Sequence, residues 1–225
     1  MADANLPWLI VAWLVYFGLH SLLASIGAKA LVATRWPRAM PAYRLGYNLL
    51  AIVLLALPLW LTLSAPGPWL WQWSGFAAVL AAILAVAALL GFFWSLRFYD
   101  SAEFLGFRQL REGIASVDDQ ERFQLSPLHR FVRHPWYFFG LVIVWTRDMN
   151  AAMLTTAILI TLYFVIGSRL EERKLIRYHG EVYRHYRERV PGLLPLPWKF
   201  LSAAEALALV ESGRHDPAAS EQTRS

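Results

Sequence analysis

Long apolar stretches alternate with short polar connections along most of the chain. Four of them approach the roughly 20 residues that a helix needs to cross a bilayer, namely 6–26, 45–63, 74–96 and 149–168. A fifth, 135–146, is shorter and would give only about 18 Å of helix at ~1.5 Å per residue. The pattern therefore predicts an all-α, polytopic membrane bundle with about five transmembrane helices.

The placement of Lys and Arg predicts the orientation of this bundle. The connection 27–44 carries basic residues and no acid, whereas the connection 64–73 carries no charge. Because short basic connections stay in the cytosol, we expect the N-terminus outside and the C-terminus inside. Arg147 and Asp148 then form an outer turn, and residues 135–168 form a helical hairpin whose charged ends lie inside.

The rest of the chain fits a single domain. Residues 169–189 are polar and predict a helical segment at the membrane surface, which ends at Val190-Pro191-Gly192 because proline and glycine stop helices. The first 24 residues carry Asp3 and no basic residue, unlike a signal peptide, and are read as a retained span. We expect one domain over 1–211 and a mobile tail over 212–225.

Composition supports the membrane class and excludes several chemistries. The chain is 57% hydrophobic, has 11 Trp and is only 16% charged, which is too apolar for a soluble domain of this size. The net charge of +5 lies beside the spans, where lipid head groups explain it, so we expect no nucleic-acid partner. Without cysteine there is no disulfide or thiolate nucleophile, and no metal site is expected.

Two clusters at the ends of the predicted hairpin could carry chemistry. Arg133-His134-Pro135-Trp136-Tyr137 begins the short span, where proline frees backbone carbonyls; alternatively His134 caps a kinked helix and Arg133 binds lipid phosphate. Glu171-Glu172 follows the last span, where cations are usual, so the pair needs a cationic partner. That partner is either a neighbouring basic side chain or a bound cationic ligand.

Further polar and aromatic positions have both a functional and a structural interpretation. Tyr183 and Tyr186 are three residues apart on one helical face, which is also typical of an interfacial aromatic belt. His20 and Asn48 lie inside predicted spans and could line an acceptor pocket. For lone polar residues an interhelical hydrogen bond is the competing explanation.

The order of these motifs resembles the C-terminal core of the isoprenylcysteine carboxyl methyltransferase and phospholipid methyltransferase superfamily. The resemblance covers about residues 126–195 and rests on Arg-His-Pro-x-Tyr, the apolar hairpin, Glu-Glu, Gly180-Glu181-x-Tyr183-x-x-Tyr186 and Val190-Pro191. Upstream, the run Phe-Leu-Gly-Phe-Arg-Gln at 104–109 and Leu19-His20-Ser21 resemble the bacterial branch that includes methanethiol S-methyltransferase and NnrU-like proteins.

The resemblance implies a pocket for S-adenosylmethionine (SAM) in this core. It implies that the cofactor contacts are His129, His134, Pro135, Trp136, Tyr137, Glu171, Glu172 and Tyr183. The candidate catalytic residues are His134 and Glu171, because either His134 or a carboxylate could take the proton of a thiol acceptor. The isoprenylcysteine enzymes carry an Arg a few residues before the acidic pair, but here that stretch is Val-Ile-Gly-Ser at 165–168. This departure argues against a prenylcysteine substrate. Arg169 is displaced toward the pair and, with His20 and Asn48, is a candidate substrate contact.

The sequence therefore predicts SAM-dependent methyl transfer to a small or lipophilic acceptor, with a thiol favoured, at the cytosolic face of a bacterial inner membrane. Such a transfer is an in-line displacement that depends on alignment and exclusion of water. A small transporter with a polar path of His20, Asn48 and His134 is an alternative, but there is no inverted repeat. A non-catalytic membrane assembly factor is the other alternative.

Overall fold

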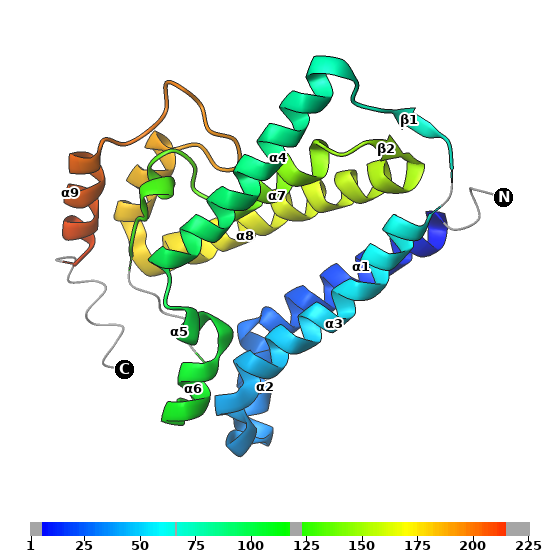
Figure 1. Ribbon diagram of the computed structural model, residues 1–225. Helices are drawn as coiled ribbons and strands as arrows, with labels where there is room; N and C mark the ends of the chain where they lie inside the picture. Colours follow the sequence, from blue (N-terminus) through cyan, green and yellow to red (C-terminus); the bar gives the residue numbers. More distant parts are fainter. Residues whose placement is uncertain (1–5, 66, 118–122, 215–225) are drawn as a thin grey trace. The chain divides into compact units, whose positions relative to one another are not determined.

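The fold is mostly helical. The computed structural model describes residues 6–65, 67–117 and 123–214 (Figure 1). Two short strands, β1 (Trp69–Trp71) and β2 (Met149–Asn150), pair antiparallel and are the departure from the predicted all-α class in the described part of the chain. The chain divides into two compact units, and the division falls within helices α4 and α8.

Four helices are long and apolar enough to cross a membrane: Leu6–Ala24, Pro37–Ser64, Gly75–Phe98 and Ala151–Arg189. They correspond to the four long stretches predicted from the sequence, which are confirmed as helices. The fifth stretch forms α7 (Pro135–Trp145), which at 11 residues spans only about 16 Å. A count of five crossings and the N-out, C-in orientation remain predictions.

Unit 1 takes in the described residues of Met1–Ile83, Leu96–Asp119 and Trp145–Ile160. Its elements are α1 (Leu6–Ala24), α2 (Ile26–Arg35), η2 (Pro37–Ala42), α3 (Tyr43–Ser64), η3 (Leu96–Phe98), α5 (Ser101–Leu105) and α6 (Phe107–Glu112), with the first parts of α4 (Gly75–Ser95) and α8 (Ala151–Arg189). Figure 1 shows α1 and α3 running side by side.

A buried polar network joins three helices of unit 1. The indole of Trp13 donates to Thr156 Oγ1 at 3.0 Å, and Thr156 Oγ1 lies 2.8 Å from Thr62 Oγ1. Thr62 also donates to the carbonyl of Pro58 at 2.7 Å. Hydroxyl and indole groups that satisfy one another stabilise helix contacts where water is excluded. The turn predicted at Arg147 and Asp148 also has a hydrogen bond of its own. The backbone N–H of Trp73 donates to the carboxylate of Asp148.

Unit 2 takes in the described residues of Leu84–Ser95, Gln120–Val144 and Thr161–Ser225. It contains the end of α4, η4 (Pro127–Arg130), α7, most of α8, and α9 (Ala203–Arg214). The polar segment predicted after residue 168 is helical, but it continues α8 directly instead of starting a separate element. The break comes at Gly180, whose φ of 54° lies in the left-handed region that glycine tolerates.

The C-terminal end of the chain differs from the expectation in one respect. Residues 203–214 form α9, so the predicted mobile tail at 212–225 begins inside a helix, because Ser212 to Arg214 complete its last turn. The remaining tail, 215–225, lies outside the described residues. The single domain over 1–211 stays a prediction.

Candidate functional site

The motif Arg133-His134-Pro135 lies against the end of α8. Pro135 is the first residue of α7, a position where the missing N–H costs nothing. The backbone N–H groups of Arg133 and His134 donate to the carbonyls of Pro191 and Gly192, at 2.9 and 3.0 Å. The residues that end the helix at 190–192 therefore also bind the segment that leads into α7, through these two backbone hydrogen bonds.

Arg133 and Glu172 form a buried ion pair. Arg133 donates from Nη2 and Nε to Glu172 Oε1, at 2.7 and 2.9 Å, and both side chains are only 11% exposed. Its Nη1 also donates to the carbonyls of Arg187 and Val190. A buried charge is tolerated only when it is paired and hydrogen-bonded, and this guanidinium meets both conditions.

His134 lies between the two adjacent carboxylates. Its Nε2 lies 3.1 Å from Glu172 Oε1 and its Nδ1 lies 3.5 Å from Glu171 Oε2. Burial alone lowers the pKa of His134, but the two carboxylates outweigh burial and raise it. Because a neutral imidazole donates from only one nitrogen, an acid at each nitrogen favours the imidazolium.

The two acids differ in their access to solvent. The Glu172 side chain is 11% exposed and already accepts from Arg133, whereas the Glu171 side chain is 48% exposed. Glu171 Oε2 is 3.5 Å from the hydroxyl of Tyr137, at the limit of a hydrogen bond. Of the pair, Glu171 is the carboxylate that a ligand can reach.

A column of rings extends from His134 to α8. The rings of His134 and Tyr137 are nearly parallel, with centroids 5.4 Å apart, and Tyr137 stacks on Phe164 at 4.5 Å. Gly140 leaves room for this arrangement, since a Cβ there would lie 3.0 Å from the Phe164 ring. Trp136 instead contacts α4, where its indole donates to Ser95 Oγ at 2.7 Å.

His129 and Tyr186 of α8 are joined by a hydrogen bond next to the site. Tyr186 donates to the carbonyl of His129 at 2.7 Å. His129 Nδ1 accepts from the backbone N–H of Ser126, and burial, assisted by the charge of His134, lowers the pKa of His129 to about 4. His129 is therefore a neutral, fixed side chain.

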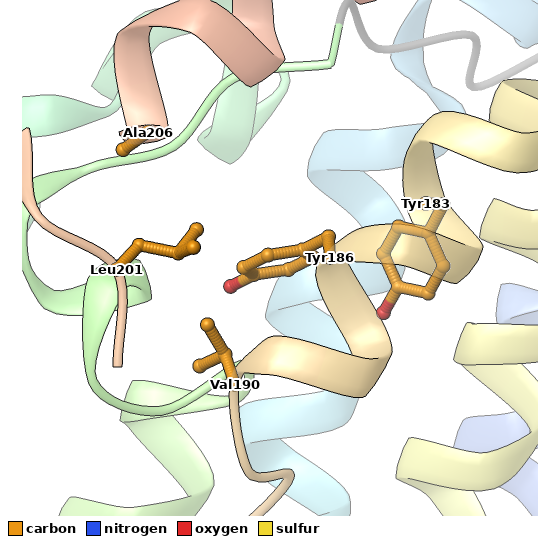
Figure 2. Close-up of a cluster of buried hydrophobic side chains, with 5 residues drawn as sticks. All are labelled: Tyr183, Tyr186, Val190, Leu201 and Ala206. Atoms are coloured by element: carbon orange, nitrogen blue, oxygen red, sulfur yellow. The ribbon is translucent and has the colours of Figure 1, made fainter. Parts of the chain in front are cut away.

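Tyr183 and Tyr186 lie in a hydrophobic core. Both are almost fully buried, and Figure 2 shows Tyr186 pointing toward Leu201 and Val190. The interfacial aromatic belt considered for these two positions is wrong, because neither ring reaches the surface. Tyr183 was expected to contact the cofactor; the structure places it in this cluster, beside Tyr186.

Two of the three candidate substrate residues belong to unit 1 and the third belongs to unit 2. His20 and Asn48 belong to unit 1, where His20 Nε2 lies 2.8 Å from the Tyr47 hydroxyl and Asn48 donates to two backbone carbonyls of α5. Arg169 is an exposed residue of α8, two positions before Glu171. Their contact with a substrate stays a prediction.

The sequence did not indicate the role of Arg133 in this cluster. Arg133 was considered only as a lipid ligand, yet its side chain bridges α7 and α8. The one feature of the sequence that could have indicated this role is the position of Arg133 directly before His134 in the motif. Among the described residues, no group of His, Asp and Glu is arranged to hold a metal ion.

Comparisons with known proteins identify relatives over most of the chain. Methanethiol S-methyltransferase 2 of Bradyrhizobium diazoefficiens is 31% identical over 198 residues, which cover 86% of this chain and 76% of the relative. The methanethiol S-methyltransferase of Mycobacterium tuberculosis is 32% identical over 205 residues, covering 84% and 79%. Nurim of Mus musculus is 25% identical over 191 residues, covering 80% and 72%.

No protein-family model and no solved structure matches the chain. The relatives nevertheless confirm the resemblance drawn from the motifs, because they are methyltransferases of this superfamily by name and cover most of the chain. Identity above 30% over more than three quarters of a relative is sufficient to show common descent. The chain therefore belongs to the family of the methanethiol S-methyltransferases, a branch of the membrane methyltransferases.

Proposed function

We propose that this protein transfers a methyl group from SAM to a small thiol, with methanethiol as the acceptor to test first. The relatives that carry this activity in their names support the acceptor. The observation that supports SAM as the donor is the half-exposed carboxylate of Glu171, which lies beside the buried imidazole of His134 and a column of aromatic rings. SAM supplies an electrophilic methyl group on a sulfonium, and its cationic groups suit this acidic, aromatic site.

We assign one side chain to ligand contact and the others to positioning. Glu171 meets the positive end of the ligand, because it is the acid of the pair that solvent reaches. Glu172 and Arg133 hold His134 and the 187–192 segment in place, so we assign them positioning roles. His134 orients Glu171, whose Oε2 lies 3.5 Å from Nδ1 of the imidazole.

The reaction balances without a covalent intermediate on the protein. The acceptor sulfur forms a bond to the methyl carbon while the bond from that carbon to the sulfonium sulfur breaks, and the thiol proton passes to solvent or to Glu171. The products are dimethyl sulfide and S-adenosylhomocysteine. Alignment and exclusion of water account for most of such an acceleration. We place the site at the cytosolic face of a bacterial inner membrane, where SAM is made and the basic connections are expected to lie.

Calorimetric titration of the detergent-purified protein with S-adenosylhomocysteine tests the donor. Glu171→Gln should weaken binding about tenfold to a hundredfold, the magnitude of a lost hydrogen bond to a charged group. Glu181→Gln is the matched control, because Glu181 is an exposed acid of the same helix paired with Arg184. Well-folded wild-type protein that does not bind would overturn the proposal.

The acceptor is tested separately by headspace gas chromatography. Purified protein in liposomes with SAM and methanethiol should release dimethyl sulfide, and Glu171→Gln should reduce the rate while Glu181→Gln does not. Binding of S-adenosylhomocysteine without release of dimethyl sulfide would exclude methanethiol as the acceptor and retain SAM as the donor.

A further inference from the structure

The short helices α5 and α6 form a hairpin that is fixed to one end of α3. Arg44 donates to the carbonyl of Glu103 at 3.0 Å, and Asn48 donates to the carbonyls of Phe104 and Leu105 at 3.1 Å each. Gly106 joins the two helices with a φ of 95°, and a Cβ there would lie 2.5 Å from the backbone nitrogen next to Arg44 in α3. The glycine of the motif 104–109 is therefore required by close approach and by conformation.

The hairpin presents large apolar side chains outward. Five of them are exposed within 11 positions: Phe104, Leu105, Phe107, Leu110 and Ile114. Phe107 and Leu110 are three residues apart on one face of α6 and are 53% and 47% exposed. A contiguous exposed set of this kind is rare on a surface that faces water.

The charged side chains of the hairpin neutralise one another. Arg108 lies 3.2 Å from Asp100, 3.2 Å from Glu103 and 3.4 Å from Glu112. Arg111 pairs with Glu112 as well. The segment therefore has no excess positive charge to attract anionic head groups, and its outward chemistry is apolar.

We propose that the α5–α6 hairpin lies in the membrane interface, with Phe107 and Leu110 inserted among lipid acyl chains. The occupant of its apolar face is lipid, because Asn48 binds the hairpin to α3, a helix apolar enough to cross a membrane, and the apolar residues that follow Asn48 there, Leu49 and Ile52, are themselves exposed. Interfacial helices bury such a face about 5–10 Å into the head-group and acyl boundary. The hydrogen bonds of Arg44 and Asn48 hold it at that depth, so Asn48 acts as an anchor of the hairpin.

The chain has no cysteine, so single-cysteine variants carry one spin label each. The label is placed by Phe107→Cys and Leu110→Cys, with Ile52→Cys as the lipid reference and Glu181→Cys as the water reference. Glu181 has an 80% exposed side chain, and Ile52 is 67% exposed in the middle of an apolar helix. Collision rates with oxygen and with a water-soluble nickel chelate are measured in phosphatidylcholine vesicles, with and without phosphatidylglycerol.

Labels at 107 and 110 should favour oxygen over nickel severalfold more than the label at 181, with ratios close to that at 52 and equal in both lipid mixtures. Nickel access equal to that at 181 would place the hairpin in water, and protection from both reagents would show that protein covers the face. Either result overturns the proposal, as would insertion that requires phosphatidylglycerol. Adding Asn48→Ala to Phe107→Cys should increase the mobility of the label, because the anchor is lost.

Discussion

The Arg133 guanidinium lies 2.7 Å from the Glu172 carboxylate, although the two residues are 39 positions apart in the chain. This ion pair connects the start of α7 with α8, and the oxygen that accepts from Arg133 is also 3.1 Å from His134 Nε2. Two adjacent acids of the same type thus have different tasks, since Glu172 is committed to the protein while Glu171 remains open.

The two glutamates should therefore respond differently to the same substitution. Glu172→Gln leaves Arg133 buried without a counter-charge, which costs about 3–5 kcal/mol of stability. Glu171→Gln should leave the melting temperature in detergent nearly unchanged and lower the affinity for S-adenosylhomocysteine. Equal thermal shifts for the two variants would contradict this division.

A lysine should not replace Arg133. The guanidinium donates in several directions at once, to Glu172 and to the carbonyls of Arg187 and Val190, and an ammonium on a different stem cannot match that geometry. We expect Arg133→Lys to lose most of the stability that Arg133→Gln loses, as measured by thermal denaturation. Arg184→Lys is the control, because its pairing with Glu181 is exposed and contributes little.

The raised pKa of His134 predicts the pH dependence of stability. A histidine whose pKa in the folded protein exceeds its ordinary value of 6.5 stabilises the fold fully below that value, and the contribution is lost as the pH rises through the folded pKa. The difference in melting temperature between wild type and His134→Asn should be largest below the ordinary histidine pKa of 6.5 and shrink as the pH rises through the higher pKa of the folded protein. His185→Asn, at an exposed position of the same unit, should show no such trend.

Gly140→Ala should disturb the ring column. The new methyl group would lie 3.0 and 3.3 Å from two atoms of Phe164, whose ring already stacks on Tyr137 at 4.5 Å and has little room to move. We expect a loss of about 1–3 kcal/mol, as for other overpacked sites, together with weaker binding of S-adenosylhomocysteine. Gly18→Ala is the matched control in another apolar helix, because nothing lies within 4 Å of its Cβ. Unchanged binding by Gly140→Ala would show that the column does not position the ligand.

Much of the architecture follows from local pattern. The four long apolar stretches are recognisable because a membrane helix must satisfy its own backbone and present apolar side chains over a fixed length. Pro191 and Gly192 likewise mark the end of α8, because proline has a fixed φ and no N–H and glycine has a freely rotating backbone. The helix α9 was not expected, because its Ala206 packs in a cluster with Tyr183 and Tyr186, which belong to α8 and precede it in the sequence.

The motifs also indicated which residues would gather, since His134, Tyr137 and Glu171 do lie together. What the sequence by itself determined was the class of protein, the positions of the spans and the membership of this cluster. Only the tertiary structure decided that Glu172 forms an ion pair with Arg133, that Glu171 stays half-exposed and that Tyr183 is buried. The physical reason is that hydrophobic length and helix stops act over a few residues, whereas burial and charge pairing depend on side chains that only folding brings together.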